Sequence, residues 1–419
     1  MAAAPQPSGS PEPRRSRRVP RGVPVLAAAP WLAVLVGLAL ALSGCGGTSG
    51  SDRAGESQAA QSEQSNGPDQ ASEPAQPVAQ KPLRADEERL TVKMTEPYTP
   101  SAPTGVGTDD YRCFLLDPEL TDPVYLTGTQ VLPGNPQVVH HVILFRVPPE
   151  KVALAEKVDS FETGPGWTCF GDTKLGEGPQ LDDAPWIGAW APGAEESVQP
   201  KGYGVRLEPG SRVIMQVHYN LLEGAEPDVS AASLRVTKPG VKLTPIRTML
   251  LPAPVELPCR PGHTESPLCD RAAALADVKA RFGEGPGSTG DLLHMLCGTK
   301  PTPGPQQSCV RVIGKPTKVL AVAGHMHLLG TSMKVEVNPG TSRARTILNI
   351  PHWDFDNQAA HRIKPVVLQP FDTVKVTCRH SQKLRDHLPS FEGQPDRYVV
   401  WGEGTTDEMC LAILQTSDG

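Results

Sequence analysis

The sequence predicts an all-β protein of two consecutive antiparallel β-sandwich domains, jelly-roll-like, with a small helical, disulfide-rich insertion. The region from residue 89 to 419 is rich in Pro and Gly and contains many short β-branched runs. Each run has the length of a strand and is bounded by Pro, Gly, Asn or Asp, as strands usually are. Only one window is clearly helical, and this many strands must close into sandwiches or barrels.

The first 45 residues have the pattern of a secretory signal. The basic run PRRSRRVPR precedes an apolar stretch, VLAAAPWLAVLVGLALAL, and then LSGC, Leu42 to Cys45. Small residues that end on a cysteine resemble a bacterial lipobox, which predicts cleavage before Cys45 and acylation of its thiol. The alternative is a single membrane-spanning anchor with an unrelated cysteine. Either segment exports the chain, and Gly46 after the cysteine is compatible with the outer membrane.

The rest of the chain divides by composition. Residues 46–88 contain almost no large apolar side chain and are predicted to form a flexible linker. Residues 89–240 are expected to form the N-terminal domain and residues 241–419 the C-terminal domain, with KPGVKLTP at the boundary. The helical window DRAAALADVKARFG has Asp270 as a possible N-cap and ends at Gly283. It lies between two pairs of cysteines, which predicts a disulfide-stapled insertion.

Cysteine number and charge limit the class of protein. An even number of cysteines in an exported chain predicts disulfides, whereas the lack of a CxxC pair argues against a thiolate zinc site. A net charge of −6 without a basic cluster after the signal gives no reason to expect a nucleic-acid partner. Besides Cys45, the cysteines are Cys113, Cys169, Cys259, Cys269, Cys297, Cys309, Cys378 and Cys410.

Five of the eleven histidines lie inside strong strand patterns. His325 and His327 end the run KVLAVAGHMHLLG, and residues i and i+2 of a strand share a face, so both rings are expected side by side. Two imidazoles placed in this way can chelate one metal ion. The same face is predicted to carry Val319, Ala321 and Ala323, and the opposite face Val322, Met326 and Leu328.

Three further imidazoles come from His140 and His141 in VVHHVILF and from His218 in VIMQVHYN. Neighbours in a regular strand point to opposite faces, so His140 and His141 can share an ion only where the strand twists or bulges. Otherwise one is a ligand and the other packs in the core. For any single histidine, a hydrogen-bonded sheet residue is the simpler interpretation. Burying five imidazoles without compensation costs stability, and the pattern therefore predicts metal binding.

Four motifs resemble, in order and spacing, those of the copper type II, ascorbate-dependent monooxygenases, which include peptidylglycine alpha-hydroxylating monooxygenase and dopamine beta-monooxygenase. The motifs are VVHHVILF, VIMQVHYN, GHMHLLG and GTTDEMC, and the resemblance spans Asp109 to Ile413. It implies an enzyme that hydroxylates an activated C–H of an organic substrate with O2 and an external reductant such as ascorbate. Together with the lipobox, it implies a lipoprotein of the bacterial cell envelope.

The resemblance further implies two copper ions per chain with unlike ligands, facing each other across a solvent-filled cleft. Imidazole accommodates both oxidation states of copper, while a soft thioether favours Cu(I), the state that must meet oxygen. The first copper passes electrons, and the second performs the hydroxylation. The implied ligands are His140, His141 and His218 for the first copper, and His325, His327 and Met409, the catalytic group, for the second.

The family pattern also implies two disulfides, Cys378 with Cys410 and Cys113 with Cys169. Cys309 occupies the place of a family cysteine whose partner lies beyond the methionine, and this chain supplies none there. The expected alternatives for Cys309 are a bond within the insertion or a free thiol. Its candidate partners are Cys259, Cys269 and Cys297.

The expected substrate is neutral or apolar. In the peptidylglycine enzyme an Arg, an Asn and a Tyr hold the substrate carboxylate, and the matching positions here are Ala323, Leu411 and Ile413, all apolar. An anionic substrate would lack a partner there. The alternative functions are a non-enzymatic copper-binding envelope lipoprotein and a structural β module. All six implied ligand positions are filled, which argues against both.

Overall fold

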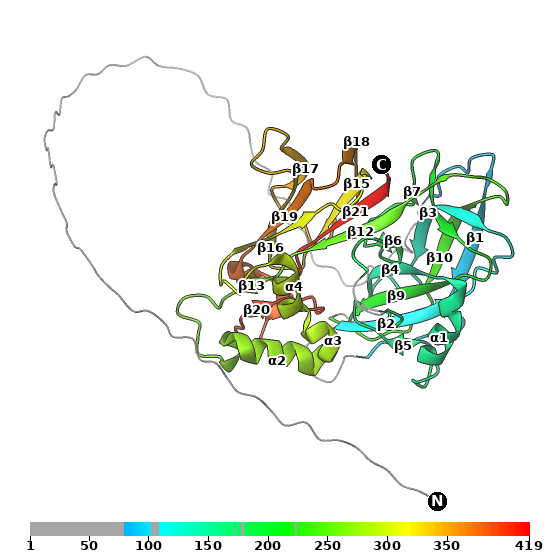
Figure 1. Ribbon diagram of the computed structural model, residues 1–419. Coiled ribbons are helices and arrows are strands. Elements are labelled where there is room, and N and C mark those ends of the chain that lie inside the picture. Colours follow the sequence, from blue (N-terminus) through cyan, green and yellow to red (C-terminus); the bar gives the residue numbers. More distant parts are fainter. Residues whose placement is uncertain (1–78, 102–108, 172, 177–179, 223) are drawn as a thin grey trace, which may run out of the picture. The chain divides into compact units, whose positions relative to one another are not determined.

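The computed structural model describes residues 79–101, 109–171, 173–176, 180–222 and 224–419 (Figure 1). The expected signal, Cys45 and most of the expected linker lie outside these ranges. Within them, no helix combines the length and the apolar character that crossing a membrane requires.

The first sandwich pairs a six-stranded sheet with a five-stranded one, and both are antiparallel apart from one short parallel pair, β11 with β8. Its core lies between the sheets and contains Val142, Leu144, Met215 and Val217. The six-stranded sheet contains β1 (Glu87–Lys93), β10 (Ala231–Thr237), β3 (Val124–Leu132), β8 (Tyr203–Leu207), β11 (Thr244–Pro245) and β7 (Ser197–Val198). The five-stranded sheet contains β5 (Trp167–Thr168), β2 (Asp109–Leu116), β9 (Arg212–Asn220), β4 (Val139–Val147) and β6 (Trp186–Trp190).

The second sandwich pairs two four-stranded antiparallel sheets around a core that contains Val322, Met333, Val376 and Leu414. A short ladder of β13 (Glu256–Leu257) and β20 (Val399–Val400) accompanies it. One sheet contains β12 (Arg247–Pro252), β21 (Leu411–Asp418), β15 (Thr317–His325) and β18 (His361–Leu368). The other contains β14 (Gln306–Val312), β19 (Thr373–His380), β16 (Gly330–Val337) and β17 (Arg345–Ile350). The predicted all-β fold of two antiparallel sandwiches is thus confirmed.

Most of the helical residues lie in the predicted insertion, between β13 and β14. The Asp270 carboxylate accepts the Ala273 N–H at 2.9 Å and caps α2, and Gly283 ends the helix with a φ of 88°. Figure 1 shows the insertion helices beside β13 and β20. They are η1 (Pro267–Cys269), α2 (Arg271–Phe282), α3 (Glu284–Gly287) and α4 (Thr289–Cys297); the other helices are α1 (Pro149–Asp159), η2 (Gln382–His387) and η3 (Pro389–Phe391).

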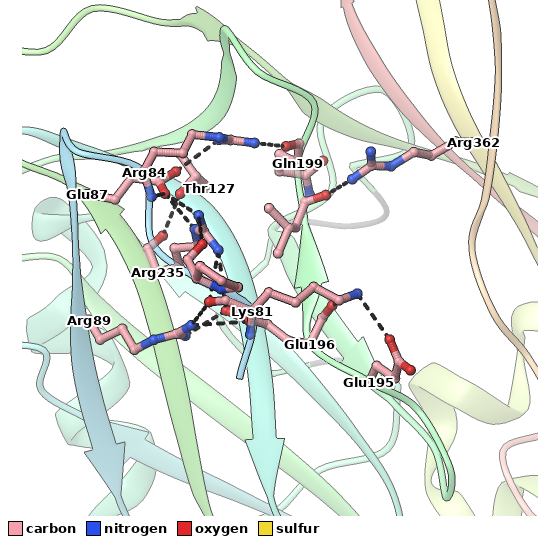
Figure 2. Close-up of polar contacts among 12 residues, drawn as sticks. Lys81, Arg84, Glu87, Arg89, Thr127, Glu195, Glu196, Gln199, Arg235 and Arg362 are labelled. Carbon is pink, nitrogen blue, oxygen red and sulfur yellow. Dashed lines mark hydrogen bonds and ion pairs between the residues drawn. The ribbon is translucent and has the colours of Figure 1, made fainter. Parts of the chain in front are cut away.

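A buried ion-pair network fastens the start of the first sandwich (Figure 2). Arg235 on β10 pairs with Glu87 at 2.5 Å, and Arg84 pairs with the same carboxylate at 2.9 Å. Arg89 pairs with Glu196 at 2.6 Å. Residues 81–88, expected as the end of the linker, therefore contribute to the fold. At the other expected boundary, β11 follows residue 240 and yet pairs with β8 of the first sandwich.

Candidate metal centre

The first histidine group consists of His140, His141 and His218. It lies on the outer face of the five-stranded sheet. Alternate residues of β9, among them Val217 and Tyr219, enter the core between the sheets, so His218 faces the other way. His141 on β4 is its cross-strand partner, and paired residues share a face. Both imidazoles therefore project from the same side of this sheet.

A bulge brings the third imidazole to the same point. Val139 pairs with Tyr219 and His141 with His218, so His140 is an extra residue without a cross-strand partner in this ladder. Of the two arrangements left open for the His-His pair, the structure has the bulged one. Consecutive residues can then place their rings together, which a regular strand forbids.

The three Nδ1 atoms of this group converge. His141 Nδ1 lies 3.2 Å from His140 Nδ1 and 3.0 Å from His218 Nδ1. Two nitrogens that bind one ion at about 2.0 Å are at most about 4 Å apart, so both distances fit a shared ion. The three rings together form a group whose ligand atoms lie within 4.8 Å of one another.

Asp109 and Tyr111 on β2 support His218. The Asp109 carboxylate lies 2.8 Å from His218 Nε2, and the Tyr111 ring stacks on the imidazole at 4.2 Å. Burial acts to raise the pKa of Asp109, but hydrogen bonds from His218 and Thr405 outweigh it and hold the pKa at about 2. An ionised carboxylate can only accept, so the proton sits on Nε2 and Nδ1 keeps its lone pair.

Burial favours the neutral form of four imidazoles, those of His140, His141, His325 and His327. It lowers the pKa of His140 to about 3 and that of His325 to about 4, and neighbouring imidazoles contribute to the shift. Burial also lowers the pKa of His141, strongly, and that of His327. At neutral pH each of these four rings therefore keeps a lone pair, as metal binding requires.

The second group consists of His325, His327 and Met409. It begins where β15 ends, and the ring centroids of His325 and His327 are 5.1 Å apart. Gln358 Oε1 accepts a hydrogen bond from His325 Nδ1 at 2.7 Å, which leaves the lone pair on Nε2. His327 Nδ1 is buried and has no hydrogen-bond partner in the described part of the chain. A buried, unpaired nitrogen is costly unless a ligand satisfies it, so these residues also fit a metal.

A second bulge corrects the predicted faces of β15. Register shifts between Val319 and Ala321, so Val319 enters the core of the second sandwich together with Val322. Val319 therefore does not share a face with His325, as strict alternation predicted. The prediction failed because a bulge reverses the parity of every residue before it.

Glu408 joins the two segments of the second group, a role that sequence reasoning missed. Its buried carboxylate accepts the backbone N–H groups of His327 at 3.1 Å and Leu329 at 2.6 Å. It also accepts the N–H of Met409 at 3.1 Å and lies 3.3 Å from His380 Nε2. The His-x-His turn is thus tied to the segment that contains Met409. The only sequence signal was an acidic residue directly before Met409.

The loop of residues 402–409 contacts both groups. Thr405 donates its N–H and its hydroxyl to Asp109 at 3.1 and 2.7 Å, and Asp109 holds His218. Tyr111 Oη donates to the Glu403 carbonyl at 2.6 Å. Met409, the implied thioether ligand, ends this loop and is 7% exposed.

The two groups are neighbours rather than opposite sides of a solvent-filled cleft. The ring centroids of His141 and His325 are 6.2 Å apart. Phe355 stacks on His140 at 4.9 Å and lies 6.4 Å from His327. The expected cleft between the two groups is not found at this point, because the hydrogen bonds of the 402–409 loop hold the two sandwiches against each other.

One cavity of about 920 Å³ reaches both groups. Its walls include His141 from the first group and His325, His327 and Met409 from the second. Leu411, one of the three apolar positions expected to face a substrate, also lines it, and Leu411 is the cross-strand partner of His325. A molecule in this cavity would lie beside the residues of both groups.

Four disulfides pair all eight cysteines that follow Cys45. Cys113–Cys169 and Cys378–Cys410 are the two pairs that the resemblance implies, and the second adjoins Met409. The insertion is closed by Cys259–Cys269 and Cys297–Cys309, which settles the pairing left open for Cys309. This many disulfides indicates a protein that folds outside the cytoplasm.

Comparisons with known proteins identify no relative of this chain. No protein-family model matches it, and no curated protein matches it. Among solved structures, the major capsid protein P2 of bacteriophage PM2 is 8% identical, with a TM-score of 0.27 over 79% of this chain and 97% of that one. Peptide N-glycanase F is 8% identical, with a TM-score of 0.27 over 79% and 99%. Likenesses as low as these support no argument about function.

Proposed function

We propose that this chain is a copper-dependent monooxygenase. It would hydroxylate an activated C–H of an organic substrate with O2 and an external, ascorbate-like reductant. The observation that supports this most strongly is the convergence of three imidazoles, of which His141 lines the same cavity as a second, unlike His-His-Met group. The reaction balances as one C–H, one O2, two electrons and two protons giving one C–OH and one water.

The residues around the two groups have separate tasks in this proposal. Copper, when bound, would supply one-electron transfer and the activation of O2. Asp109 holds the proton on His218 Nε2, and Gln358 holds His325 Nδ1, so each imidazole presents its other nitrogen. Glu408 keeps the His-x-His turn beside Met409. The cavity confines a substrate next to these side chains.

A neutral substrate fits the charges around the cavity. Each basic side chain that lines it within the described ranges already has a partner. Arg146 pairs with Asp183 at 2.6 Å, and Arg247 pairs with Asp418 at 2.6 Å. Lys151 donates to the Leu175 carbonyl at 3.0 Å, and Arg206 pairs with Glu208 at 2.5 Å. Three of the four positive charges are therefore already compensated by a carboxylate, which leaves less charge for an anionic substrate.

We further infer that the protein works in the cell envelope, anchored through acylated Cys45. The disulfides support export, and the lipobox-like sequence supports the anchor. Mass spectrometry of the purified mature protein tests the anchor, because acylation would add a lipid to an N-terminal Cys45. An unmodified Cys45 would contradict it.

The function is tested by isotope labelling. Copper-loaded, full-length protein is incubated with ascorbate, 18O2 and a panel of neutral organic compounds, and the products are analysed by mass spectrometry. A monooxygenase gives products that contain one 18O atom per molecule. Met409→Ile, which removes the implied thioether ligand, serves as the matched control and is expected to give none.

Two results would overturn the proposal. Copper bound at both groups without any 18O incorporation across the panel would favour the alternative, a copper-binding lipoprotein. Incorporation that persists in Met409→Ile would show that the reaction takes place elsewhere in the chain or without it.

A further inference from the structure

The cavity beside the metal groups is elongated along β4. His141, Ile143 and Phe145 take alternate positions on one face of this strand, and all three line the cavity. Arg146, near the end of the strand, lines it as well. From His141 to Arg146 an extended strand covers about 17 Å. One wall of the cavity therefore begins at the first group and continues well past it.

The opposite wall includes β12. Leu411 is the cross-strand partner of both His325 on β15 and Pro252 on β12, so Pro252 marks the end of β12 that lies nearest the second group. Leu250 and Arg247 follow along the strand, and all three residues of β12 line the cavity. From Pro252 to Arg247 the strand again covers about 17 Å. Both walls therefore lead away from the metal groups over a similar length.

Asp183 joins the far ends of the two walls. Its carboxylate lies 2.6 Å from the Arg146 guanidinium and 3.9 Å from that of Arg247. Arg247 also pairs with Asp418 at 2.6 Å. The far end of the cavity is therefore polar, while carboxylates compensate the positive charge of both arginines.

Between the two ends the walls are largely apolar. Ile143 on β4 and Leu250 on β12 are only partly buried in their hydrophobic clusters. Trp186 is the cross-strand partner of Phe145, and the Leu181 carbonyl accepts the Leu250 N–H at 2.8 Å; both residues also line the cavity. A passage of this kind gains most from an apolar ligand of matching length, because each buried methylene adds to the binding free energy.

We propose that the substrate is a neutral amphiphile with an unbranched alkyl chain that lies between β4 and β12. At about 1.3 Å per carbon, a passage of this length accommodates about twelve carbons. This inference deepens the proposed function, on which the word substrate rests. Binding of the chain itself does not depend on turnover.

The reaction sets the direction of the chain. A C–H bond is activated by a neighbouring oxygen, nitrogen or unsaturated carbon, so the polar head has to lie beside His325 and Met409. The chain then points towards Asp183. Methylenes beyond about the twelfth carbon would enter the polar far end, where they gain little from burial. The passage therefore sets a maximum to the useful chain length.

The first test measures how binding depends on chain length. Primary alcohols from 1-hexanol to 1-tetradecanol are titrated into metal-free, full-length protein, and binding is followed by tryptophan fluorescence. The dissociation constant should fall about three- to four-fold per added methylene as far as 1-dodecanol and then level off. A dissociation constant that does not change between 1-hexanol and 1-dodecanol would overturn the inference.

A bulky residue placed along the passage should shorten it. In Leu250→Trp the dissociation constant of 1-hexanol should change less than about two-fold, whereas 1-dodecanol should bind no tighter than 1-octanol. Unchanged binding of 1-hexanol shows that the variant is folded. Val367→Trp is the matched control, because Val367 is 49% exposed on β18, the other edge strand of the same sheet. The same chain-length dependence in Leu250→Trp and in the wild type would contradict the proposed path.

Photo-crosslinking tests the direction without any variant. Two analogues of 1-dodecanol carry a diazirine, one next to the hydroxyl and one at the chain end, and mass spectrometry identifies the labelled peptides. The first should label peptides around His325 and Met409, and the second peptides around Arg146 and Asp183. The reverse pattern, or labelling of both ends by both probes, would overturn the inference.

Failure of the inference and failure of the proposed function give different results. The expected chain-length dependence in a protein that transfers no oxygen would leave the chain site standing and refute only the proposed function. Incorporation of 18O into compact neutral compounds, without any preference for a long chain, would refute this inference and leave the monooxygenase standing.

Discussion

Two buried carboxylates, Asp109 and Glu408, hold the candidate ligands in place. Neither is itself a candidate metal ligand. Asp109 accepts from His218 Nε2, and Glu408 accepts the backbone N–H groups of His327 and Leu329 at the end of the His-x-His turn. Partners of this kind fix which nitrogen of an imidazole is free, and their loss weakens metal binding without removing a ligand.

Replacing Asp109 with Asn tests this role. The amide can turn its NH2 group toward His218 Nε2, which favours the wrong tautomer and moves the proton to Nδ1. We expect copper affinity at the first group to fall by about 10- to 100-fold, measured by competition with a chelator. Asp110→Asn is the matched control, because that neighbouring carboxylate accepts from Tyr98 and Ser101 instead. Equal losses in the two variants would contradict the prediction.

Met409→Ile removes the only sulfur of the second group and keeps an apolar side chain of similar volume. Hydroxylation should fall by at least about 100-fold, while copper still binds at His140, His141 and His218. Metal analysis and 18O incorporation measure the two effects separately. Unchanged turnover would show that Met409 is core filler at this position.

At the scale of elements, the helical insertion holds the loop that presents Met409. Arg281 on α2 forms two hydrogen bonds with the Asp407 carboxylate, at 2.7 and 2.6 Å. Asp407 in turn accepts the Gly404 N–H within the loop at 3.1 Å. The helical insertion therefore helps to position the loop that contains Met409.

The substitution Arg281→Met tests that link. Asp407 would lose its bidentate partner while remaining buried, with an expected cost on the order of 3 kcal/mol in the free energy of unfolding. Copper affinity should fall more at the second group than at the first. Urea denaturation of the metal-free protein and chelator competition measure these effects. Lys279→Met on the same helix removes only a more exposed pair with Glu284 and should cost less than about 1 kcal/mol.

The network at β1 predicts a dependence of stability on pH. Burial acts to raise the pKa of Glu87, but hydrogen bonds from Arg235 and Arg84 outweigh it and hold the pKa at about 2, below the ordinary 4.5. The stabilisation by the ionised carboxylate is therefore fully present above pH 4.5 and is lost as the pH falls from 4.5 towards 2.

Glu87→Gln should accordingly lower the free energy of unfolding by on the order of 2 kcal/mol at pH 6. The difference from the wild type should shrink steadily below pH 4.5. Urea denaturation at several pH values between 6 and 3 measures it. Glu88→Gln, at the exposed neighbouring residue, should show no such trend. A difference for Glu87→Gln that stays constant over this range would contradict the assignment.

At the scale of the whole molecule, contacts between the two sandwiches occur at several places besides the metal groups. Arg362 on β18 donates to the Val198 carbonyl of β7, and Lys318 donates to the Tyr203 hydroxyl at 3.0 Å (Figure 2 shows the first). Arg311 pairs with Asp182 at 2.6 Å. Together with the bonds of the 402–409 loop, they couple the two cores.

This coupling predicts cooperative unfolding. In calorimetry the metal-free protein should unfold in a single transition, with near-ultraviolet circular dichroism and tryptophan fluorescence giving the same midpoint. Copper that fills only the first group, as in Met409→Ile, should raise that midpoint for the whole molecule. Two separate transitions, with only the first shifted by copper, would show that the sandwiches unfold independently.

Local patterns in the sequence predicted much of this structure. The strand runs predicted two antiparallel sandwiches, the Asp270 and Gly283 signals predicted α2, and the spacing of His325 and His327 predicted rings on one face. These features depend on residues close together in the chain, whose conformations follow from turn chemistry, capping and a period of two. Sequence alone therefore determined the elements and the candidate ligands.

Tertiary structure decided how these elements meet. The bulge at His140 and the one between Val319 and Ala321 exist only through pairing with partner strands, so no pattern within either strand could predict them. The contacts of Asp109 with Thr405 and of Tyr111 with Glu403 join residues almost 300 positions apart, separated by 296 and 292. The contact between the two histidine groups and the pairing of Cys309 with Cys297 depend on packing of the whole chain, because no local pattern encodes which separate elements meet in space.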